Sequence, residues 1–316
     1  MSFLTAFLGG FEAVLSVFML LVLGFVLTIK GKINGTVASF MSWFVVNITS
    51  PLNIFGSVMT SFSSAEIPNI PKYVAIPLVS HILGFLAGFL IVKLFKVEKK
   101  YAGSLIIMTA LNNTIFMGLP VNLAMFGEAS VPFVLYYYIS NMILFWTLGI
   151  FCLSGKVEKQ KPIDVVKKII PPPLYGMFAG IALLLISTYV TPVTIPDFIM
   201  DTFDSVGSMT TPIAMMYIGF VLADRGLKNI KIDKNILLGL CARFIVGPAI
   251  TIVVLSFIPM DPLMKNVFTV QAFMPVMATQ SIVAQRYGAD PYFPAVMVSL
   301  STVISLIILP LVKVCL

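Results

Sequence analysis

The chain has 316 residues, of which 59% are hydrophobic and only 10% are charged, and its formal net charge is +7. A water-soluble protein carries about 25% charged residues because its surface faces water. The composition therefore excludes a pair of soluble domains and identifies an integral membrane protein. In such a chain a positive net charge indicates basic cytoplasmic loops rather than binding to nucleic acid.

Cysteine and histidine usage narrows the chemistry further. The three cysteines are widely spaced in or at the ends of apolar segments, and the chain has one histidine, His81. This pattern indicates neither a disulfide framework nor a histidine-based metal or haem site, so we expect no cofactor. An enzyme is also disfavoured, because the sequence offers no mid-membrane pair of acids and no hydroxyl nucleophile in a triad pattern with His81.

Apolar runs near 20 residues, the length that crosses a bilayer, predict the membrane spans. In chain order they are 11–29, 36–60, 73–95, 102–126, 131–153, 169–190, 198–222, 234–258, 264–286 and 292–315. The first lacks the basic start and cleavage site of a signal peptide, so we expect it to be retained. The sequence thus predicts an all-α membrane protein with ten transmembrane helices.

The basic residues predict the orientation. Sixteen of the twenty lysines and arginines fall in loops after odd-numbered spans: Lys30, Lys32, Lys93, Lys96, Lys99, Lys100, Lys156, Lys159, Lys161, Lys167, Lys168, Arg225, Lys228, Lys231, Lys234 and Arg286. The opposite side holds Lys72, Lys265 and Lys313. Since basic loops stay in the cytoplasm, we expect a plasma-membrane protein with both termini outside.

The two halves of the chain are related by an offset of 161 residues. The run Thr49-Ser50-Pro51 then falls on Thr210-Thr211-Pro212, and Gly127 falls on Gly288. The basic segment 93–100 falls on 254–261, which has no lysine or arginine. We therefore predict two inverted five-helix repeats, residues 1–155 and 169–316, joined by a cytoplasmic linker at 156–168. Inverted repeats are typical of secondary transporters.

Spans 4 and 9 each combine amides, a hydroxyl and a proline at mid-span. Pro120 lies in the first and Pro275 in the second. A proline inside a membrane helix frees backbone carbonyls, which protein, water or ligand must satisfy. Two broken helices that meet at the midplane would also present half-helix N-termini to an anion.

Three motifs carry a resemblance to a known family. The run NNTIFMGLP at 112–120, followed by AMFG at 124–127, resembles the fourth helix of the auxin efflux carriers. The run ARFIVGPA at 242–249 resembles their eighth helix, and QAFMP at 271–275 with AQRYG at 284–288 is similar to their ninth. The similarity covers essentially the whole chain, without the long central loop of the plant members.

This resemblance implies a fold and a mechanism. It implies crossing of proline-broken helices 4 and 9, and elevator-like movement of a transport domain (helices 3–5 and 8–10) against a scaffold (helices 1, 2, 6 and 7), usually in a homodimer. Family substrates are organic anions: auxin in plants, and malate, malonate or similar carboxylates in bacteria. Some plant members carry an acidic residue in the third helix, whereas 73–95 contains none.

The candidate substrate site follows from the breaks and from the resemblance. Asn113 matches the family's crossover asparagine and Pro275 the ninth-helix proline. The substrate-binding residues expected are Asn113, Asn112, Pro275, Thr279 and Gln280, and Pro120 and Gly118 are expected to shape the crossover. The alternative is that the amides only bond neighbouring helices and that the prolines are ordinary kinks.

Two further residues are candidates for charge or coupling roles. Arg243 is the charged residue deep within a span, so it either attracts a carboxylate or caps freed carbonyls near a broken helix. His81 lies in span 3 and either replaces the missing acid in proton coupling or is a hydrogen-bonded histidine of the bundle.

The function predicted from these features is secondary transport of a small organic anion, with membrane lipids and a second copy of the chain as partners. An anion channel and a carrier-like ligand sensor are the alternatives. The driving ion, H⁺ or Na⁺, stays open at this stage.

Overall fold

The computed structural model describes residues 19–61, 67–115, 117–154, 172–225 and 232–316. All regular structure within these ranges is helical. The linker predicted at 156–168 and the start of the first span lie outside the described residues.

A first helix covers Met19–Ile29. The remaining α-helices are α2 (Gly35–Phe44), α3 (Ser50–Ser61), α4 (Ile70–Leu94), α5 (Lys99–Ala110), α6 (Gly118–Phe126), α7 (Val131–Leu144), α8 (Ile150–Ser154), α10 (Pro172–Tyr189), α11 (Asp197–Ser208), α12 (Thr210–Arg225), α13 (Lys234–Cys241), α14 (Gly247–Ser256), α15 (Pro262–Ala272), α16 (Thr279–Arg286) and α17 (Tyr292–Cys315).

Several of these helices join into rods long enough to cross a membrane. In the described part of the chain six helical rods are long and apolar enough, and their bounds are Gly35–Thr60, Ile70–Leu94, Val131–Ser154, Asp197–Asp224, Lys234–Ser256 and Tyr292–Lys313. Two shorter apolar helices, Met19–Ile29 and Tyr175–Tyr189, accompany them. The chain is therefore a helical, multi-pass membrane protein.

Three of the rods contain a single π-helical turn. These turns are η1 (Val45–Thr49) between α2 and α3, η4 (Phe145–Gly149) between α7 and α8, and η6 (Ala242–Val246) between α13 and α14. A π-turn inserts one extra residue into a helix and re-aims the side chains that follow.

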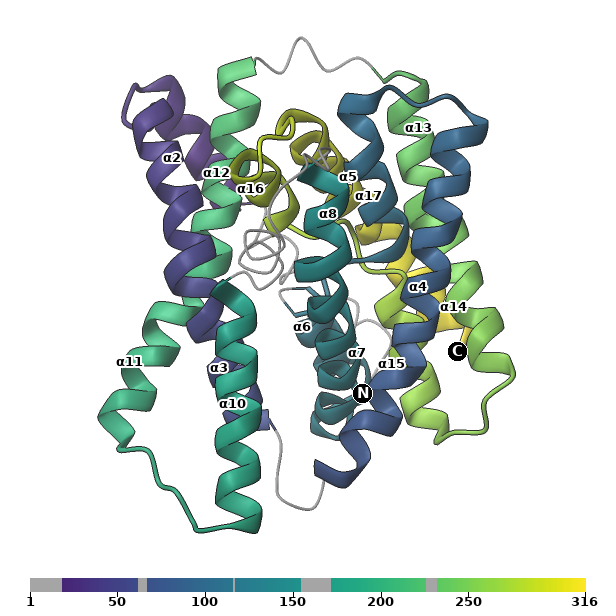
Figure 1. Ribbon diagram of the computed structural model, residues 1–316. Helices are drawn as coiled ribbons and strands as arrows, with labels where there is room; N and C mark the ends of the chain where they lie inside the picture. The colour runs from purple at the N-terminus through teal and green to yellow at the C-terminus, as the bar shows by residue number, and fades with distance from the viewer. Residues whose placement is uncertain (1–18, 62–66, 116, 155–171, 226–231) are drawn as a thin grey trace, which may run out of the picture.

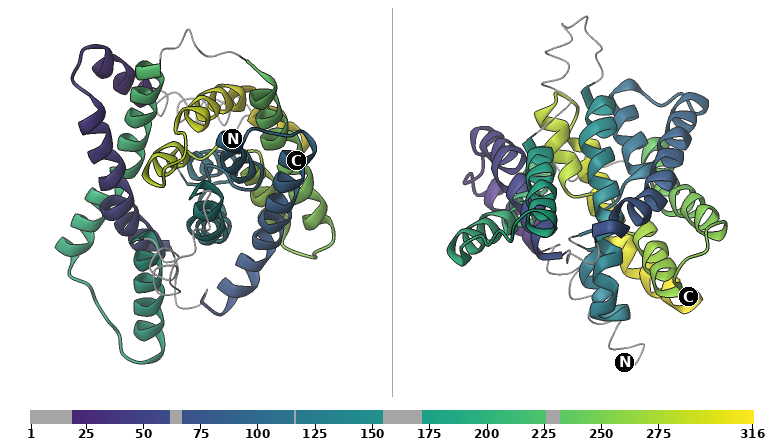
Figure 2. Two further views of the ribbon diagram at one scale, coloured as in Figure 1. Left: turned by 45° about the horizontal axis from the view of Figure 1, so that its top comes forward. Right: turned by 60° about the horizontal axis from the view of Figure 1, so that its bottom comes forward.

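The helices form two groups. We call them the left-hand group (α2, α3, α10, α11 and α12) and the right-hand group (α4, α5, α7, α14, α15 and α17). On the left of Figure 1, α3 packs against α10 and α11, and α2 packs against α12. On the right, α4 packs against α5, α7 and α14, and α15 packs against α7 and α17. The two further views in Figure 2 keep the same division, with α16 next to α12 where the groups meet.

Small residues let helix α4 approach α5 closely. A Cβ atom placed on Gly84 would lie 2.8 Å from the Cα atom of Ala110, and one on Gly88 would lie 2.8 Å from that of Ile106. Close packing of this kind is the usual way that helices associate in a membrane. It holds α4 against α5, the half-helix that ends at Ala110.

Corresponding loops lie at opposite ends of the molecule. In Figure 1 the loop from α4 to α5 is at the top, whereas the loop from α14 to α15 is at the bottom.

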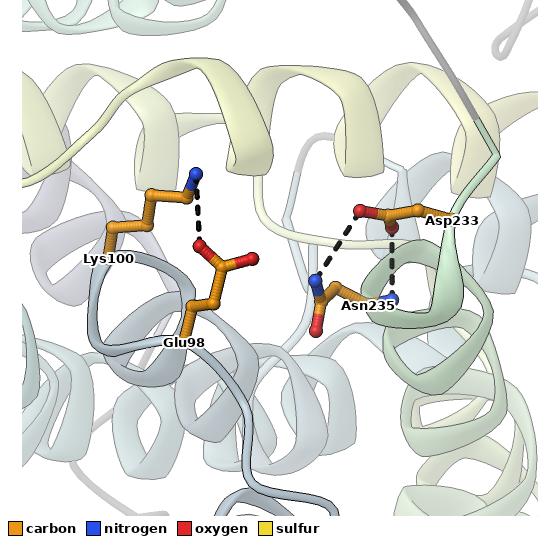
Figure 3. A network of polar contacts seen from close by, with 4 residues as sticks. All are labelled: Glu98, Lys100, Asp233 and Asn235. Carbon is orange, nitrogen blue, oxygen red and sulfur yellow. Dashed lines mark hydrogen bonds and ion pairs between the residues drawn. The ribbon is translucent and has the colours of Figure 1, made fainter.

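Polar contacts occur at the helix starts at the top end of the molecule (Figure 3). Lys100 Nζ lies 3.1 Å from Glu98 Oε2, and Asp233 caps α13 by accepting from the backbone N–H groups of Asn235 and Ile236 at 3.0 and 2.9 Å.

Candidate functional site

Two helices of the right-hand group are each interrupted by a non-helical segment, which we call a helix break. The first break lies between α5 and α6, and the second between α15 and α16. Helix α5 ends at Ala110 and α6 begins at Gly118, and α15 ends at Ala272 and α16 begins at Thr279. The two non-helical segments touch, because the backbone N–H of Asn113 donates to the carbonyl of Pro275 at 2.9 Å. Gln271 Nε2 adds a second link by donating to the carbonyl of Thr114 at 3.1 Å. Residues 157 or more positions apart in sequence are thus joined at one point.

Asn112 belongs to a buried amide network. Its Nδ2 donates to the Gln271 carbonyl at 2.6 Å. Asn141, on α7, donates from Nδ2 to the Asn112 carbonyl at 2.8 Å and accepts from the Asn112 backbone N–H at 3.3 Å. The side chain of Asn112 therefore serves the interhelical bonding that the structural alternative expected, while the residue also lines the cavity described next.

A cavity lies where the first break faces the left-hand group of helices. Its lining comes from α3, the first break, the α7–α8 rod, α12 and the second break with the start of α16: Ser50, Asn53, Ile54, Asn112, Asn113, Thr114, Ile115, Tyr138, Met142, Trp146, Thr210, Met277 and Thr279. Its volume is about 30 Å³, room for about one or two water molecules, so a larger ligand requires the lining to open.

Asn113 is the residue of the first break whose side-chain amide donor is unpaired within the described part of the chain. It lines the cavity and is 2% exposed. Its Nδ2 is a buried donor with no hydrogen-bond partner among the described residues. An unpaired buried donor costs roughly 1–3 kcal/mol, so an acceptor that reached this amide would stabilise the structure.

Arg243 lies in the π-turn η6 and is 1% exposed. Its Nη1 donates to the carbonyls of Met108 and Leu111 at 2.9 and 2.8 Å, and its Nη2 donates to the carbonyl of Ala272. These carbonyls end α5 and α15, so one guanidinium caps both half-helices. This is the contact that the capping interpretation expects. Arg243 is not among the side chains that line the cavity.

His81 is not among the residues that line the cavity. It is 1% exposed, and its Nδ1 lies 2.9 Å from Ser140 Oγ. Its ring meets that of Tyr137 edge-on, with centroids 4.8 Å apart. The contacts are those of a hydrogen-bonded histidine of the bundle, and a role in coupling stays a prediction.

The other expected site residues divide between the cavity and its frame. Thr279 is the first residue of α16 and lines the cavity. Gln280 is outside that lining, and its Nε2 donates to the Ser104 carbonyl at 2.8 Å. Pro275 contributes its carbonyl to the link with Asn113. Gly118 begins α6, and the side chain of Pro120 lies outside the described residues.

The sequence predictions missed Asn141, which bonds Asn112, and Trp146, which lines the cavity. Asn141 lies outside the family motifs, and only its place near the middle of an apolar rod could have singled it out. Trp146 reads in sequence as an ordinary apolar residue, and the π-turn that holds it is not visible in the apolar pattern. No group of three or more potential metal ligands occurs among the described residues.

Comparison with known proteins gives this architecture a family. Residues 10–313 match a family described as membrane transport protein. The chain belongs to this family. The match confirms the resemblance to the auxin efflux carriers drawn from the three motifs. The family consists of membrane transporters rather than enzymes.

Two archaeal relatives agree with this assignment. A protein of Methanocaldococcus jannaschii named an uncharacterized transporter is 28% identical, over 95% of this chain and 96% of its own length. A protein of Methanothermobacter thermautotrophicus with the same description is 26% identical, over 96% of this chain and 98% of its own length. The chain is thus a full-length match to proteins named as transporters.

Proposed function

We propose that this membrane transporter is a secondary carrier for a small organic anion, bound where the two broken helices meet. The observation that carries the proposal is the Asn113–Pro275 link, at 2.9 Å, beside a cavity lined by Asn113 and by Thr279, the first residue of α16. A half-helix N-terminus and an unpaired amide donor both favour a negative group.

The charges of the half-helices support an anionic substrate. A helix carries roughly +0.5 charge at its N-terminus and −0.5 at its C-terminus. Arg243 caps the negative ends of α5 and α15. The positive ends of α6 and α16 have no acidic residue in the first turn. About one positive charge is therefore left without a partner, which suits a carboxylate.

Several coincidences support ten spans in two inverted repeats. The offset of 161 residues carries the rod Val131–Ser154 onto the bounds of α17, Tyr292–Cys315, and it carries Gly118 onto Thr279, the first residue of α16. It carries Gly127 onto Gly288, and the two glycines have φ values of 74° and 78°. The opposite loop positions in Figure 1 agree with inversion.

The position of the cavity supports alternating access. Ser50 and Thr210 line it from the left-hand group, and Asn113 and Met277 line it from the right-hand group. A substrate bound there would be released if the right-hand group, which holds the breaks, moved against the left. We therefore propose an elevator-type carrier, with the left-hand group as scaffold.

The remaining parts of the proposal concern the setting of the protein. We place it in the plasma membrane, among lipids and as a homodimer, with both termini outside. H⁺ or Na⁺ is the coupling ion to be tested.

A binding screen tests substrate class and coupling ion together. The purified protein is heated with acetate, butyrate, malonate, malate or benzoate, with and without Na⁺ and at two pH values. A ligand that binds only the folded state raises the melting temperature. Stabilisation by a carboxylate supports the proposal, and stabilisation only by cations or neutral solutes contradicts it.

Counterflow separates a carrier from a channel. Proteoliposomes loaded with an unlabelled carboxylate that binds are diluted into the labelled compound. An alternating-access carrier accumulates label transiently because exchange is faster than net efflux. A channel shows no acceleration by internal substrate, and that result would replace the carrier by the channel alternative.

A further inference from the structure

The π-turns point to a residue of the site that no family motif marks. Arg243 lies in η6 and caps the broken helices, and Thr49 ends η1, where its hydroxyl lies 2.9 Å from that of Thr210. The third π-turn, η4, contains Trp146. π-turns occur frequently at functional sites, and this one places an indole in the lining of the cavity.

Trp146 brings a second unpaired donor to the cavity. Its side chain is 2% exposed, and its Nε1–H has no hydrogen-bond partner in the described part of the chain. Asn113, which lines the same cavity, brings the same feature through its Nδ2. Buried tryptophan N–H groups usually find a partner. An acceptor bound in this cavity is the simplest partner for both donors.

We propose that Trp146 is a substrate-binding residue, and that its indole N–H and the Asn113 amide hold the two oxygens of one carboxylate. This inference rests on the proposed function and adds to it the binding role of Trp146 and the class of acid. Both donors are uncharged, so they lose less hydration energy on burial than lysine or arginine would.

The cavity favours an acid with a single negative charge. None of its lining residues is charged. The half-helix ends leave about one positive charge without a partner, so a second carboxylate would be buried without compensation. Apolar side chains cover much of the remaining wall: Ile54, Ile115, Met142 and Met277. The charge and polarity of the lining therefore favour a monocarboxylate with a short apolar tail over a dicarboxylate.

The chain offers a direct spectroscopic test, because it contains only two tryptophans. The other, Trp43, is 42% exposed and lies outside the cavity lining. In the Trp43→Phe variant, Trp146 is the sole indole. We expect butyrate and acetate to change its emission saturably, malonate to do so at least ten-fold more weakly, and chloride at equal ionic strength to leave it unchanged.

The Trp146→Phe variant tests the hydrogen bond itself, since it keeps an aromatic ring and removes the N–H. Loss of a hydrogen bond to a charged group predicts about ten-fold or weaker binding of butyrate in the thermal-shift assay. Trp43→Phe is the matched control and should bind butyrate as the native protein does.

The outcomes separate this inference from the proposed function. If butyrate binds Trp146→Phe and the native protein equally, while Asn113→Ala binds it about ten-fold more weakly, Trp146 is not a ligand and the carrier proposal stands. If malonate binds the native protein more tightly than butyrate, the single-charge class is wrong. If no carboxylate binds the native protein, the proposed function itself fails. If Trp146→Phe does not fold, the emission of Trp146 in the Trp43→Phe variant decides.

Discussion

The two helix breaks have a similar backbone course, but the side chains that they carry differ in polarity. The first, between α5 and α6, carries Asn112, Asn113 and Thr114, which all line the cavity, and Asn141 donates to the backbone carbonyl of Asn112. The second, between α15 and α16, has only apolar side chains at 274–277 and contributes backbone groups. The Pro275 carbonyl accepts from Asn113, and the Val276 N–H donates to Ser301 Oγ at 3.0 Å.

This difference shows how a repeated fold can hold one asymmetric site. Ser140 and Ser301 stand 161 positions apart in sequence, but Ser140 contacts His81 whereas Ser301 accepts from the second break. The first break supplies the polar side chains, and the second supplies the backbone frame. Changes to the shared frame should therefore damage both breaks, and a change to the unpaired amide of Asn113 should damage binding alone.

The largest effect is expected from Arg243→Met, because one side chain serves both breaks. Removing the guanidinium leaves three carbonyls without their donor. At about 1 kcal/mol or more for each buried carbonyl left unpaired, the protein should melt well below the native temperature and lose carboxylate binding. The matched control is Arg286→Met, an exposed arginine in the last turn of α16. Equal melting temperatures for the two variants would contradict the capping role.

Asn113→Ala and Pro275→Ala test whether the first break supplies the binding side chains and the second only backbone groups. Asn113→Ala keeps the backbone N–H that donates to Pro275 but removes the unpaired side-chain amide. The carboxylate concentration that gives half-maximal uptake should therefore rise about ten-fold. Pro275→Ala keeps the accepting carbonyl, so the effect on half-saturation should be smaller. A greater loss of substrate affinity in Pro275→Ala would show that the second break, and not the first, binds the substrate.

Gly118→Ala tests the contact that locks the breaks together. A Cβ atom on Gly118 would lie 2.3 Å from Oε1 of Gln271 and 2.6 Å from its Nε2, which donates to the Thr114 carbonyl. The substitution should lower stability by roughly 1–3 kcal/mol, measured as a shift in melting temperature.

The same contact can be checked by a double-mutant cycle. Gln271→Ala removes the amide with which a Cβ atom on residue 118 would clash. In that background, Gly118→Ala should therefore lower the melting temperature only slightly further. Additive costs would show that Gly118 is constrained by something other than Gln271.

The smallest effect is expected from His81→Gln. Its described neighbours are the Ser140 hydroxyl and the Tyr137 ring, with the Arg243 guanidinium acting on it at longer range. A glutamine can keep a bond to Ser140, so the pH profile of uptake should be unchanged. A profile that shifts in His81→Gln but not in the conservative variant Ser140→Ala would instead favour a role for the imidazole in proton coupling.

The sequence predicted the features that depend on composition and motifs. The membrane class follows from the scarcity of charge, and the family follows from the runs around Asn113, Arg243 and Pro275. The capping alternative for Arg243 was also available, because a charge deep in a span next to a proline-bearing helix has few other partners.

Other parts of the site could not be predicted, because they depend on packing between distant segments. The pairing of Asn112 with Asn141 requires α7 to lie beside the first break. The presence of Trp146 in the cavity depends on the π-turn η4, which changes the register of an otherwise uniform apolar helix. Gln280, whose mid-span amide suggested a ligand contact, donates to the Ser104 carbonyl, a contact that also depends on packing between distant segments.

The most direct test of the central claim is counterflow of labelled butyrate into proteoliposomes containing Asn113→Asp. This change keeps the shape of the side chain and places a negative charge at the proposed carboxylate site. Asn69→Asp, the same change at an exposed residue before α4, is the matched control. The account predicts that counterflow is abolished in Asn113→Asp and retained in Asn69→Asp, with both proteins folded. Native counterflow in Asn113→Asp would contradict it.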